Sequence, residues 1–451
     1  VVDEATLGRR RDEISRFMTD NGFPDVPVVP VSNVTLDGIS EVRNVLSGLV
    51  ESVVPRKDVR VFRMNFERVF SVKGFGTVVS GIPLSGTVRI DDELELHPSG
   101  KRVHVKAIQN YKHEAQETSA GTCSALNLRG IEPEEAGRGM TLAAPGFFFP
   151  VKSLIVEISN IGADFSVRHN MEVKFHSGTS ELNARILLFD KGSIGPGRSS
   201  AARIRLDDVV VLAPGDKFIV RSLSPSATIG GGTVLLCGES LSKRNAPGFS
   251  KGIDAALDSL RKSDFFQAAL ACSGESIVEH AGLLKLSGLV PTEAEALISE
   301  KVKGGFLIAL RGGAYMIRMR LDELLSTAAK TLKSFHDRNK LAIGMDAESF
   351  CRTFKIKAAN FAALLDALAS APGSEIKSAG GKAALKSFSP GTNPKMLELK
   401  AKVLAYVEKT GVNCAAAGNI VADLRIPEAD LKAAVKMLAD EKSVVVIGNH
   451  L

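Results

Sequence analysis

A change of pattern near residue 240 is the feature that most constrains how this chain can fold. From residue 59 to residue 236, short β-rich runs alternate with turns that carry Gly and Pro, such as Pro98-Ser99-Gly100. Many short strands separated by such turns are typical of β-sandwiches and β-barrels. The region is long enough for two small barrels, with a boundary near Pro145-Gly146. The first strands are expected at Val59–Met64, Val69–Val72, Thr77–Val79, Arg89–Leu96 and Val103–Ile108.

Beyond residue 240 the pattern becomes helical and recurs about every 70 residues. Each copy has a helix and two short apolar runs, with a glycine-containing pair between the runs that suits a tight hairpin turn. Helices followed by a two-stranded wing indicate a winged helix. The predicted helices are Glu293–Val302, Ala358–Leu368 and Pro427–Leu438. The predicted strands are Phe306–Leu310, Tyr315–Ile317, Ile376–Lys377, Leu385–Phe388 and Val444–Ile447.

The first 55 or so residues have a different organisation. The spacing of apolar residues predicts a helix over Ala5–Phe17, a short strand over Val28–Val31 and a second helix over Ile39–Leu49. Such a βα unit is too small to be a whole domain, and a parallel strand needs neighbours. We therefore expect these residues to be the end of an α/β domain whose other strands lie upstream.

Composition narrows the class of protein. The five cysteines are widely spaced and form no C-x-x-C pair, which argues against a disulfide framework or a zinc site and favours a reducing cytoplasm. No apolar run approaches the roughly 18–20 residues of a membrane span, and the acidic start predicts no signal peptide. The net charge of +6 permits a polyanionic partner such as RNA, although ordinary surface lysines explain it equally well. We expect a cytoplasmic monomer that does not bind membranes.

Residues 69–81, with the sequence VFSVKGFGTVVSG, carry a more specific signal. Taken alone, Gly74-Phe75-Gly76 indicates a bulge in a barrel strand or a close approach of the backbone to another molecule. The segment closely resembles the second-domain barrel of translational GTPases of the elongation factor Tu class. Its KGFGTVV form resembles the bacterial selenocysteine-specific elongation factors within that class. His176–Arg185 (HSGTSELNAR) and residues 215–232 resemble the third domain of the same family.

The resemblance covers nearly the whole chain and implies a multidomain fold. It implies the C-terminal remnant of an α/β G domain, two antiparallel β-barrels corresponding to domains II and III of translational GTPases, and α+β winged-helix repeats. Most of the G domain and the last winged helix of the family would be missing. The implied domains are residues 1–56 (GTPase remnant), 57–145 (barrel II), 146–240 (barrel III), 241–318 and 319–390 (winged helices 1 and 2), and 391–451 (winged helix 3, incomplete).

The resemblance also implies a pocket for the aminoacyl end of a tRNA. In the family this end lies against the second domain, and an acidic–Arg pair before the glycine-interrupted strand helps to form the selenocysteine pocket. A guanidinium there would favour an anionic selenolate over a neutral serine hydroxyl. A later Arg of the family's pocket corresponds here to Cys123, which would move the second cation elsewhere, with Arg129 as the candidate. The implied pocket residues are Glu67, Arg68, Phe75, Gly76, Thr77 and Cys123. A surface ion pair is the alternative for Glu67 and Arg68.

Two further sets of residues follow from the same resemblance. His176 and Arg185 are candidates for contact with tRNA phosphates, since imidazole and guanidinium groups suit a phosphate surface. A strand-end histidine held by a neighbour is the alternative for His176. Ser32 and Asn33 loosely match the last guanine-binding motif of GTPases, although any strand–turn–helix segment looks similar.

The motifs that cradle nucleotide phosphates are absent from the sequence. It contains neither G-x-x-x-x-G-K-[ST] nor N-K-x-D, and Gly380-Gly381-Lys382 is followed by Ala383, which has no hydroxyl for Mg²⁺. Intact members of the family bind GTP and Mg²⁺. We expect this chain to hold neither and not to hydrolyse GTP alone. No catalytic or metal site is expected either.

By resemblance, the intact protein delivers selenocysteyl-tRNA to the ribosome at UGA and recognises an mRNA hairpin through its winged helices. The hairpin contact would be weakened here, because the last winged helix is missing. Two alternatives remain open from the sequence. One is a non-enzymatic RNA- or DNA-binding protein built from barrels and winged helices, and the other is a different translational GTPase.

Overall fold

The computed structural model describes residues 2–53, 58–72, 76–162, 165–189, 192–238, 249–339, 342–388, 394–410, 416–441 and 443–446. The chain forms two compact units, Val1–Asp58 and Val59–Leu451. Within the described ranges, no helix combines the length and the apolar character that a membrane span requires.

The first unit consists of two helices, α1 (Glu4–Asp20) and α2 (Ile39–Ser52). Asp3 caps α1 by accepting a hydrogen bond from the Thr6 amide at 2.8 Å. Gly38 begins α2 with φ 76°, and a Cβ at this position would lie 2.0 Å from the Pro30 carbonyl oxygen. Neither helix has a buried residue. Their apolar faces are therefore covered at most in part by the described residues of this unit.

The strand predicted over Val28–Val31 is wrong. These residues belong to no strand and pair with no described segment. Pro27 and Pro30 have no amide N–H to donate to a ladder, and the described residues of this unit include no neighbouring strand. Both predicted helices are present, each extended by a few residues.

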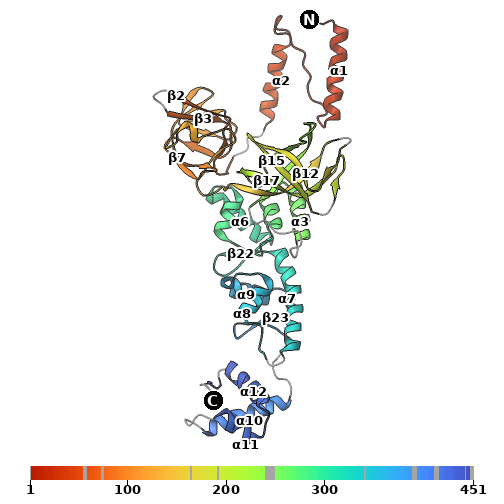
Figure 1. The fold of residues 1–451 in the computed structure, drawn as a ribbon. Helices are drawn as coiled ribbons and strands as arrows, with labels where there is room; N and C mark the ends of the chain where they lie inside the picture. The colour runs from red at the N-terminus through yellow and green to blue at the C-terminus, as the bar shows by residue number, and fades with distance from the viewer. Residues whose placement is uncertain are drawn as a thin grey trace. The chain divides into compact units, whose positions relative to one another are not determined.

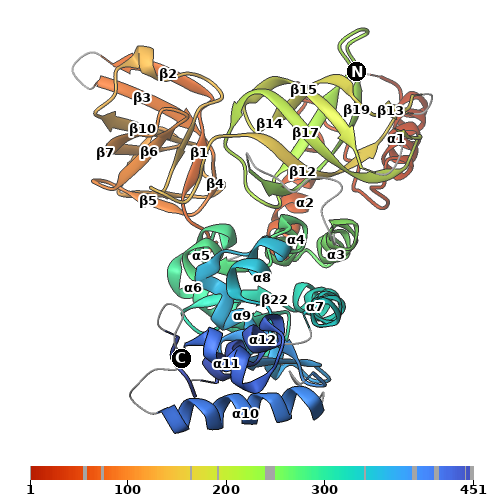
Figure 2. The ribbon, with the colours of Figure 1, turned by 60° about the horizontal axis from the view of Figure 1, so that its bottom comes forward.

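The first barrel of the second unit is an antiparallel sheet of nine strands that curves around its own core (Figure 2). The strand order is β2-β3-β10-β7-β6-β11-β1-β4, β8 adds to β7, and β5 pairs with β9 apart from the sheet. The core contains Met64, Phe66, Leu96, Leu126 and Leu142. The bounds are β1 (Arg63–Asn65), β2 (Arg68–Val72), β3 (Gly76–Gly81), β4 (Pro83–Ser85), β5 (Thr87–Arg89), β6 (Glu93–His97), β7 (Lys101–Asn110), β8 (His113–Ala115), β9 (Glu117–Ser119), β10 (Ser124–Arg129), η1 (Pro133–Glu135) and β11 (Thr141–Ala143).

Two strand predictions in this barrel need correction. The run Arg89–Leu96 is divided between β5 and β6, because Asp91 has φ 70° and the Asp92 carboxylate accepts the Arg89 amide at 2.7 Å, which makes a turn. The run Val59–Met64 contributes only its end to β1. Its first half instead pairs with the first helical unit, which follows the second barrel and comprises α3 to β22 (residues 249–317). There the Val61 amide donates to the Gly288 carbonyl at 2.9 Å.

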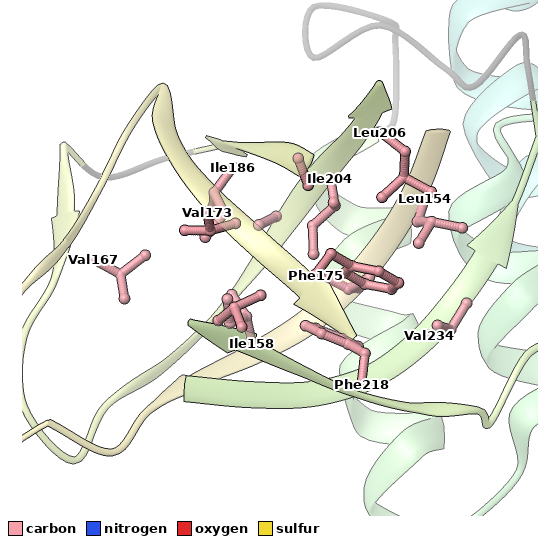
Figure 3. Packing of buried hydrophobic residues seen from close by; sticks show 14 of the residues in the cluster. Leu154, Ile158, Val167, Val173, Phe175, Ile186, Ile204, Leu206, Phe218 and Val234 are labelled. Atoms are coloured by element: carbon pink, nitrogen blue, oxygen red, sulfur yellow. The ribbon is translucent and has the colours of Figure 1, made fainter. Parts of the chain in front are cut away.

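The second barrel is closed, with the strand order β12-β17-β15-β14-β18-β19. Phe175 and Phe218 stack in its core with ring centroids 5.3 Å apart, among aliphatic side chains that point inward from every strand (Figure 3). A short pair, β13 with β16, lies outside the barrel sheet. The bounds are β12 (Val151–Asn160), β13 (Val167–Arg168), β14 (Met171–Ser177), β15 (Ser180–Leu188), β16 (Ser193–Ile194), β17 (Ser199–Val210), β18 (Lys217–Arg221) and β19 (Thr228–Cys237).

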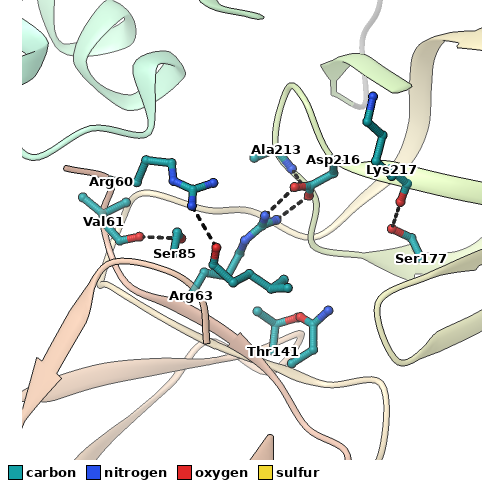
Figure 4. A network of polar contacts seen from close by, with 11 residues as sticks. Arg60, Val61, Arg63, Ser85, Thr141, Ser177, Ala213, Asp216 and Lys217 are labelled. Atoms are coloured by element: carbon teal, nitrogen blue, oxygen red, sulfur yellow. Dashed lines mark hydrogen bonds and ion pairs between the residues drawn. The ribbon is translucent and has the colours of Figure 1, made fainter. Parts of the chain in front are cut away.

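A buried ion pair joins the two barrels. Arg63, which is 3% exposed, forms two hydrogen bonds of 2.6 Å to the two carboxylate oxygens of Asp216 (Figure 4). The Ala213 amide donates to the same carboxylate at 2.8 Å. Nearby, Gly178 of the second barrel lies so close to Asn65 of the first that a Cβ would lie 2.0 Å from the side-chain nitrogen, Nδ2, of Asn65. These contacts fix how the barrels meet.

The first helical unit packs against both barrels. Its helices α3 and α4 share a buried cluster with Ile155, Leu235 and Leu236 of the second barrel. Val290 joins a second cluster with Val61 and Phe148. The elements are α3 (Phe249–Arg261), α4 (Phe265–Ser273), β20 (Ile277–Glu279), α5 (His280–Ser287), α6 (Pro291–Lys303), β21 (Leu307–Ala309) and β22 (Ala314–Ile317), and the strands form one sheet in the order β20-β22-β21.

The second helical unit continues directly from β22 through the long helix α7 (Figure 1). Its elements are α7 (Arg318–Arg338), α8 (Ala347–Phe354), η2 (Ala358–Asn360), α9 (Phe361–Ser370), β23 (Ile376–Ala379) and β24 (Lys382–Leu385). The predicted strand Leu385–Phe388 is misplaced, because β24 begins immediately after the turn at Gly380-Gly381 and ends at Leu385.

The third helical unit contains α10 (Pro394–Thr410), α11 (Ala417–Leu424) and α12 (Glu428–Asp440). The helix predicted over Pro427–Leu438 is present as α12. The predicted strand Val444–Ile447 is not, since residues 444–446 form no strand and residue 447 lies outside the described residues, as does the predicted turn Gly448-Asn449. The succession of barrels and helical units follows the prediction, and the exact domain boundaries stay predictions.

Candidate functional site

The ladder β2–β3–β10 on the first barrel carries most of the residues that the sequence singled out. Arg68 pairs with Ser80, and Ser80 pairs with Ala125. Val72 pairs with Gly76 at the other end of the β2–β3 hairpin. Because a strand advances about 3.3 Å per residue, these two ends lie about 13 Å apart. The structure therefore separates the predicted pocket residues into two groups.

The first group contains Glu67, Arg68 and Cys123. Both charged side chains are exposed, and in the described part of the chain neither forms an ion pair or a side-chain hydrogen bond. Cys123 is exposed and directly precedes Ser124, which pairs with Gly81. Cys123, which the resemblance aligned with a later Arg of the family's pocket, thus lies at the Arg68 end of the ladder.

The second group contains Gly76, Thr77 and Arg129. They line a depression of about 250 Å³ that also involves Lys106 and Glu132. Gly76 has φ 92°, and no atom of the described residues lies within 4 Å of where a Cβ would be, so a ligand could approach the backbone here. Thr77 is buried and its hydroxyl donates to the Ile131 carbonyl at 2.8 Å, which is a structural role.

Two expectations about this pocket are affected by the geometry. Arg129 adjoins Leu128, which pairs with Thr77, so it cannot complete a compact pocket with Arg68. Phe75 lies outside the described residues. Among the remaining predicted residues, Arg68 provides a cation at one end of the exposed ladder and Arg129 provides one at the other end.

On the second barrel, His176 and Arg185 lie on neighbouring strands, β14 and β15. His176 pairs with Glu181 and with Ile219, and its Nε2 is buried without a hydrogen-bond partner in the described residues. Arg185 forms an ion pair with Glu172, which partly neutralises it. The structure places both side chains on the outer surface of the barrel, on alternate positions to the inward-facing core residues.

Cations that the sequence analysis missed surround these two residues. Arg221 lies directly opposite Lys174, and Arg205 lies directly opposite Arg185. Lys174 and Arg185 are each paired with a carboxylate, Glu181 and Glu172, which offsets the repulsion between like charges on facing strands. The sequence contains a pattern that could have predicted these cations, because in Arg203-Ile204-Arg205 two cationic residues flank a core residue. Arg203 is half-buried, and burial lowers the pKa of its guanidinium. Cationic side chains therefore gather on this outer surface of the barrel, and two of them are paired with carboxylates.

Ser32 and Asn33 lie in the first unit, in the turn that leads to α2. The Ser32 hydroxyl accepts a hydrogen bond from the Thr35 amide at 3.1 Å, and the Ser32 amide donates to the Asp37 carbonyl at 3.0 Å. Asn33 is exposed. The hydroxyl thus shapes a local turn, which is the alternative that the sequence left open. No group of three or more His, Cys, Asp or Glu side chains in the described residues is placed to hold a metal ion.

Comparisons with known proteins agree with this architecture. Residues 76–143 match the family model "Elongation factor Tu domain 2". Residues 153–240 match the model "Selenocysteine-specific elongation factor, beta-barrel domain". The tandem barrels are therefore similar to those of translation elongation factors. Within that class the chain is similar to the selenocysteine-specific factors, the SelB type.

Two curated relatives carry the name "Selenocysteine-specific elongation factor". The one from Desulfomicrobium baculatum is 33% identical over 236 residues, which is 52% of this chain and 37% of the relative. The one from Haemophilus influenzae is 34% identical over 202 residues, or 45% of this chain and 32% of the relative. The matched part thus spans about a third of each relative's length.

A crystal structure of a bacterial selenocysteine-specific elongation factor, EF-Sec, has a similar fold. The TM-score is 0.61 at 20% sequence identity, and the likeness covers 100% of this chain and 78% of that one. This agreement confirms the predicted fold class, from the barrels to the helical C-terminal region.

Proposed function

We propose that this chain is the tRNA-engaging part of a selenocysteine-specific elongation factor, a cytoplasmic protein that acts as a monomer. The observation that carries the proposal is Arg68, an exposed cation without a carboxylate partner in the described residues. It lies at one end of a glycine-interrupted ladder, on a barrel that precedes a SelB-type barrel.

Arg68 would discriminate between amino acids by charge. A selenolate is anionic at neutral pH and a serine hydroxyl is not, so only the first gains from a nearby guanidinium. The exposure of Arg68 keeps its side chain available, and Glu67 beside it limits the net charge. Cys123, at the same end, contributes no second cation.

The other end of the ladder would hold the terminal nucleotide. Gly76 leaves its backbone open to a ligand, and Arg129 offers a cation for a phosphate or a ribose oxygen. The separation of about 13 Å between the two ends suits an aminoacylated nucleotide in an extended conformation. The cations around His176 and Arg185 on the second barrel would contact phosphates of the tRNA stem.

The intact protein would also bind GTP with Mg²⁺, deliver selenocysteyl-tRNA to the ribosome at UGA and recognise an mRNA hairpin. GTP hydrolysis would depend on sequence that this chain lacks, namely the P-loop and N-K-x-D motifs. The three helical units would act as winged helices and hold the hairpin-binding end at a distance from the barrels. Their own contact with the hairpin would be weak.

The test compares selenocysteyl-tRNA with seryl-tRNA on this chain. Arg68→Ala should weaken selenocysteyl-tRNA binding about tenfold, because a hydrogen-bonded charge is lost, and seryl-tRNA binding less than about twofold. Arg89→Ala removes an equally exposed arginine of the same barrel, one engaged with Glu117, and serves as the matched control. Filter binding over a salt series measures both affinities.

Equal losses for the two tRNAs would refute the pocket and leave only a phosphate contact. Absence of tRNA binding by the unmodified chain at low salt would refute the wider proposal.

A further inference from the structure

A cavity of about 730 Å³ opens where the first barrel, the second barrel and the first helical unit meet. Its walls come from the segment before β1, the linker Phe147–Phe149, the loop Ala213–Asp216 and the ends of α4 and α5. It lies away from the ladder of the candidate site, and none of the residues that the proposed function uses lines it.

The lining carries an excess of positive charge. Five cationic side chains and two carboxylates line the cavity. The carboxylates are already neutralised, since Asp216 is bound by Arg63 and Asp264 by Lys301 at 2.5 Å. Burial, with the nearby Asp216 charge, raises the pKa of the Cys237 thiol, so this side chain adds no charge to the cavity wall. The net field in the cavity therefore favours an anion.

Two lysines at the rim have no carboxylate partner in the part of the chain that the structure describes. Lys262 is exposed in the turn between α3 and α4. Lys285 is exposed at the end of α5, and its Nζ lies 5.2 Å from the centre of the Phe149 ring. Lysine ammonium groups act as mobile point charges, which suits a phosphate chain better than a single planar carboxylate.

Aromatic side chains form a large part of the wall. Phe149 is 55% exposed, which is unusual for a ring at a domain junction. Phe265 packs against the Gly215 backbone, because a Cβ there would lie 3.0 Å from its ring. The Lys285 ammonium group lies over one face of the Phe149 ring, so a planar ligand could stack on the other face while the ammonium group binds its anionic part.

We propose that this cavity binds a nucleotide, that is, a flat heterocycle joined to a short phosphate chain. The base would stack on Phe149 and the phosphates would lie between Lys262 and Lys285. A site at a domain junction with apolar walls and a few convergent polar groups is typical of small-ligand binding. The bound nucleotide would touch both barrels and the first helical unit at once. This inference does not depend on the proposed tRNA function.

The test uses the 451-residue chain and a methylanthraniloyl-labelled guanosine diphosphate, followed by fluorescence anisotropy. Unlabelled GDP should displace the probe at least about tenfold more effectively than guanosine or inorganic pyrophosphate, because only GDP has both parts. The double variant Lys262→Gln, Lys285→Gln should weaken binding about tenfold, and Phe149→Leu should weaken it while leaving its salt dependence unchanged.

Lys303→Gln provides the matched control, because Lys303 is an exposed lysine of α6 that does not line the cavity. It should bind the probe as the unmodified chain does. No saturable binding up to about 1 mM, or binding unchanged by the double variant, overturns the site. Pyrophosphate competing as well as GDP overturns the nucleotide assignment. The three substituted residues are exposed, and circular dichroism of each variant checks that it folds.

Discussion

The second and third helical units have the same order of helices but bury their apolar faces differently. In both, an eight-residue helix (α8 or α11) ends at a residue in the left-handed conformation, Lys355 with φ 55° and Arg425 with φ 51°. In both, the next amide turns back to the helix, from Ile356 to the Cys351 carbonyl and from Ile426 to the Val421 carbonyl. The local chemistry is thus repeated closely.

Their cores are not equivalent. The core of the second helical unit includes Leu310, Ala314 and Met316 from the first helical unit, packed with Phe350 and its neighbours. In the described part of the third helical unit, every member of the core cluster comes from within that unit, among them Val403 and Leu438. Shared clusters therefore link the barrels to the first helical unit, and the first helical unit to the second. The lesson is that one repeated fold can be either part of a continuous core or a separate one.

The largest effect should come from the buried ion pair between the barrels. The two barrels and the first two helical units, which share buried clusters, are called the linked block here. Arg63→Ala should lower the free energy of unfolding of this block by about 3–5 kcal/mol, because it leaves Asp216 charged and without its partner. Differential scanning calorimetry should show the main transition moving while the transition of the third unit stays in place. Arg89→Ala, which breaks the exposed pair with Glu117, should cost about 0–1 kcal/mol. Similar small losses in both variants would show that the barrels are not locked together by this pair.

Cavity-forming substitutions test the comparison of the cores directly. Phe350→Ala should cost about 3–5 kcal/mol and Leu438→Ala about 2–5 kcal/mol, since both side chains are fully buried. Calorimetry should show Phe350→Ala shifting the transition of the linked block and Leu438→Ala shifting only the third unit. If either substitution moves both transitions together, the third unit does not unfold separately.

A smaller effect is expected where the barrels touch at Gly178. Gly178→Ala should destabilise the chain by about 1–3 kcal/mol more than Gly197→Ala, because its Cβ collides with Asn65. Both glycines lie in the second barrel with positive φ, 56° and 64°, and no atom of the described residues lies within 4 Å of a Cβ at Gly197. The control therefore carries the backbone strain alone. If urea denaturation showed the same loss of unfolding free energy for both variants, Asn65 would not lie against the turn at Gly178 in solution.

The smallest effect concerns pH and His336 in the second unit. Burial lowers the pKa of His336, with Lys377 acting in the same direction, and the neutral ring accepts the Leu385 amide at 3.3 Å. The unfolded chain therefore takes up this proton more readily than the folded one. The contribution of the neutral ring should be complete above about pH 6.5 and should be lost as the pH falls through the lowered pKa of the folded state.

Thermal denaturation of the unmodified chain and of His336→Gln between about pH 5 and 8 measures this contribution. Gln can still accept the Leu385 amide but does not titrate, so the variant should lose the His336-dependent part of the pH profile. Parallel profiles for the two proteins would exclude His336 as the source.

Much of the fold could be predicted from local sequence chemistry. Gly380-Gly381 marks the wing of the second unit because both glycines adopt positive φ, at 58° and 72°. Apolar spacing located α6, α9 and α12 to within a few residues. What failed depended on distant partners: Val28–Val31 has the composition of a strand, but nothing in its described unit pairs with it.

The candidate site was predicted less completely, for a related reason. The resemblance selected Arg68, Gly76 and Cys123, but their separation into two ends of a ladder depends on strand register, which a linear motif does not give. The cross-strand cations Lys174 and Arg221 are 47 positions apart in the sequence, and only the closure of the barrel brings them together. Local sequence patterns also could not predict which barrels and helical units share a buried cluster.

Helix α7 has a consequence for how this protein can change length. It has 21 residues and so spans about 31 Å. It passes without a break from the first helical unit, where Arg320 contacts the Ala271 carbonyl, into the core of the second helical unit. An inserted residue would turn everything beyond it by about 100° around the helix axis. Seven inserted residues would restore the original facing to within about 20°. Relatives whose helix α7 differs in length should therefore differ by a number of residues close to a whole number of helical turns.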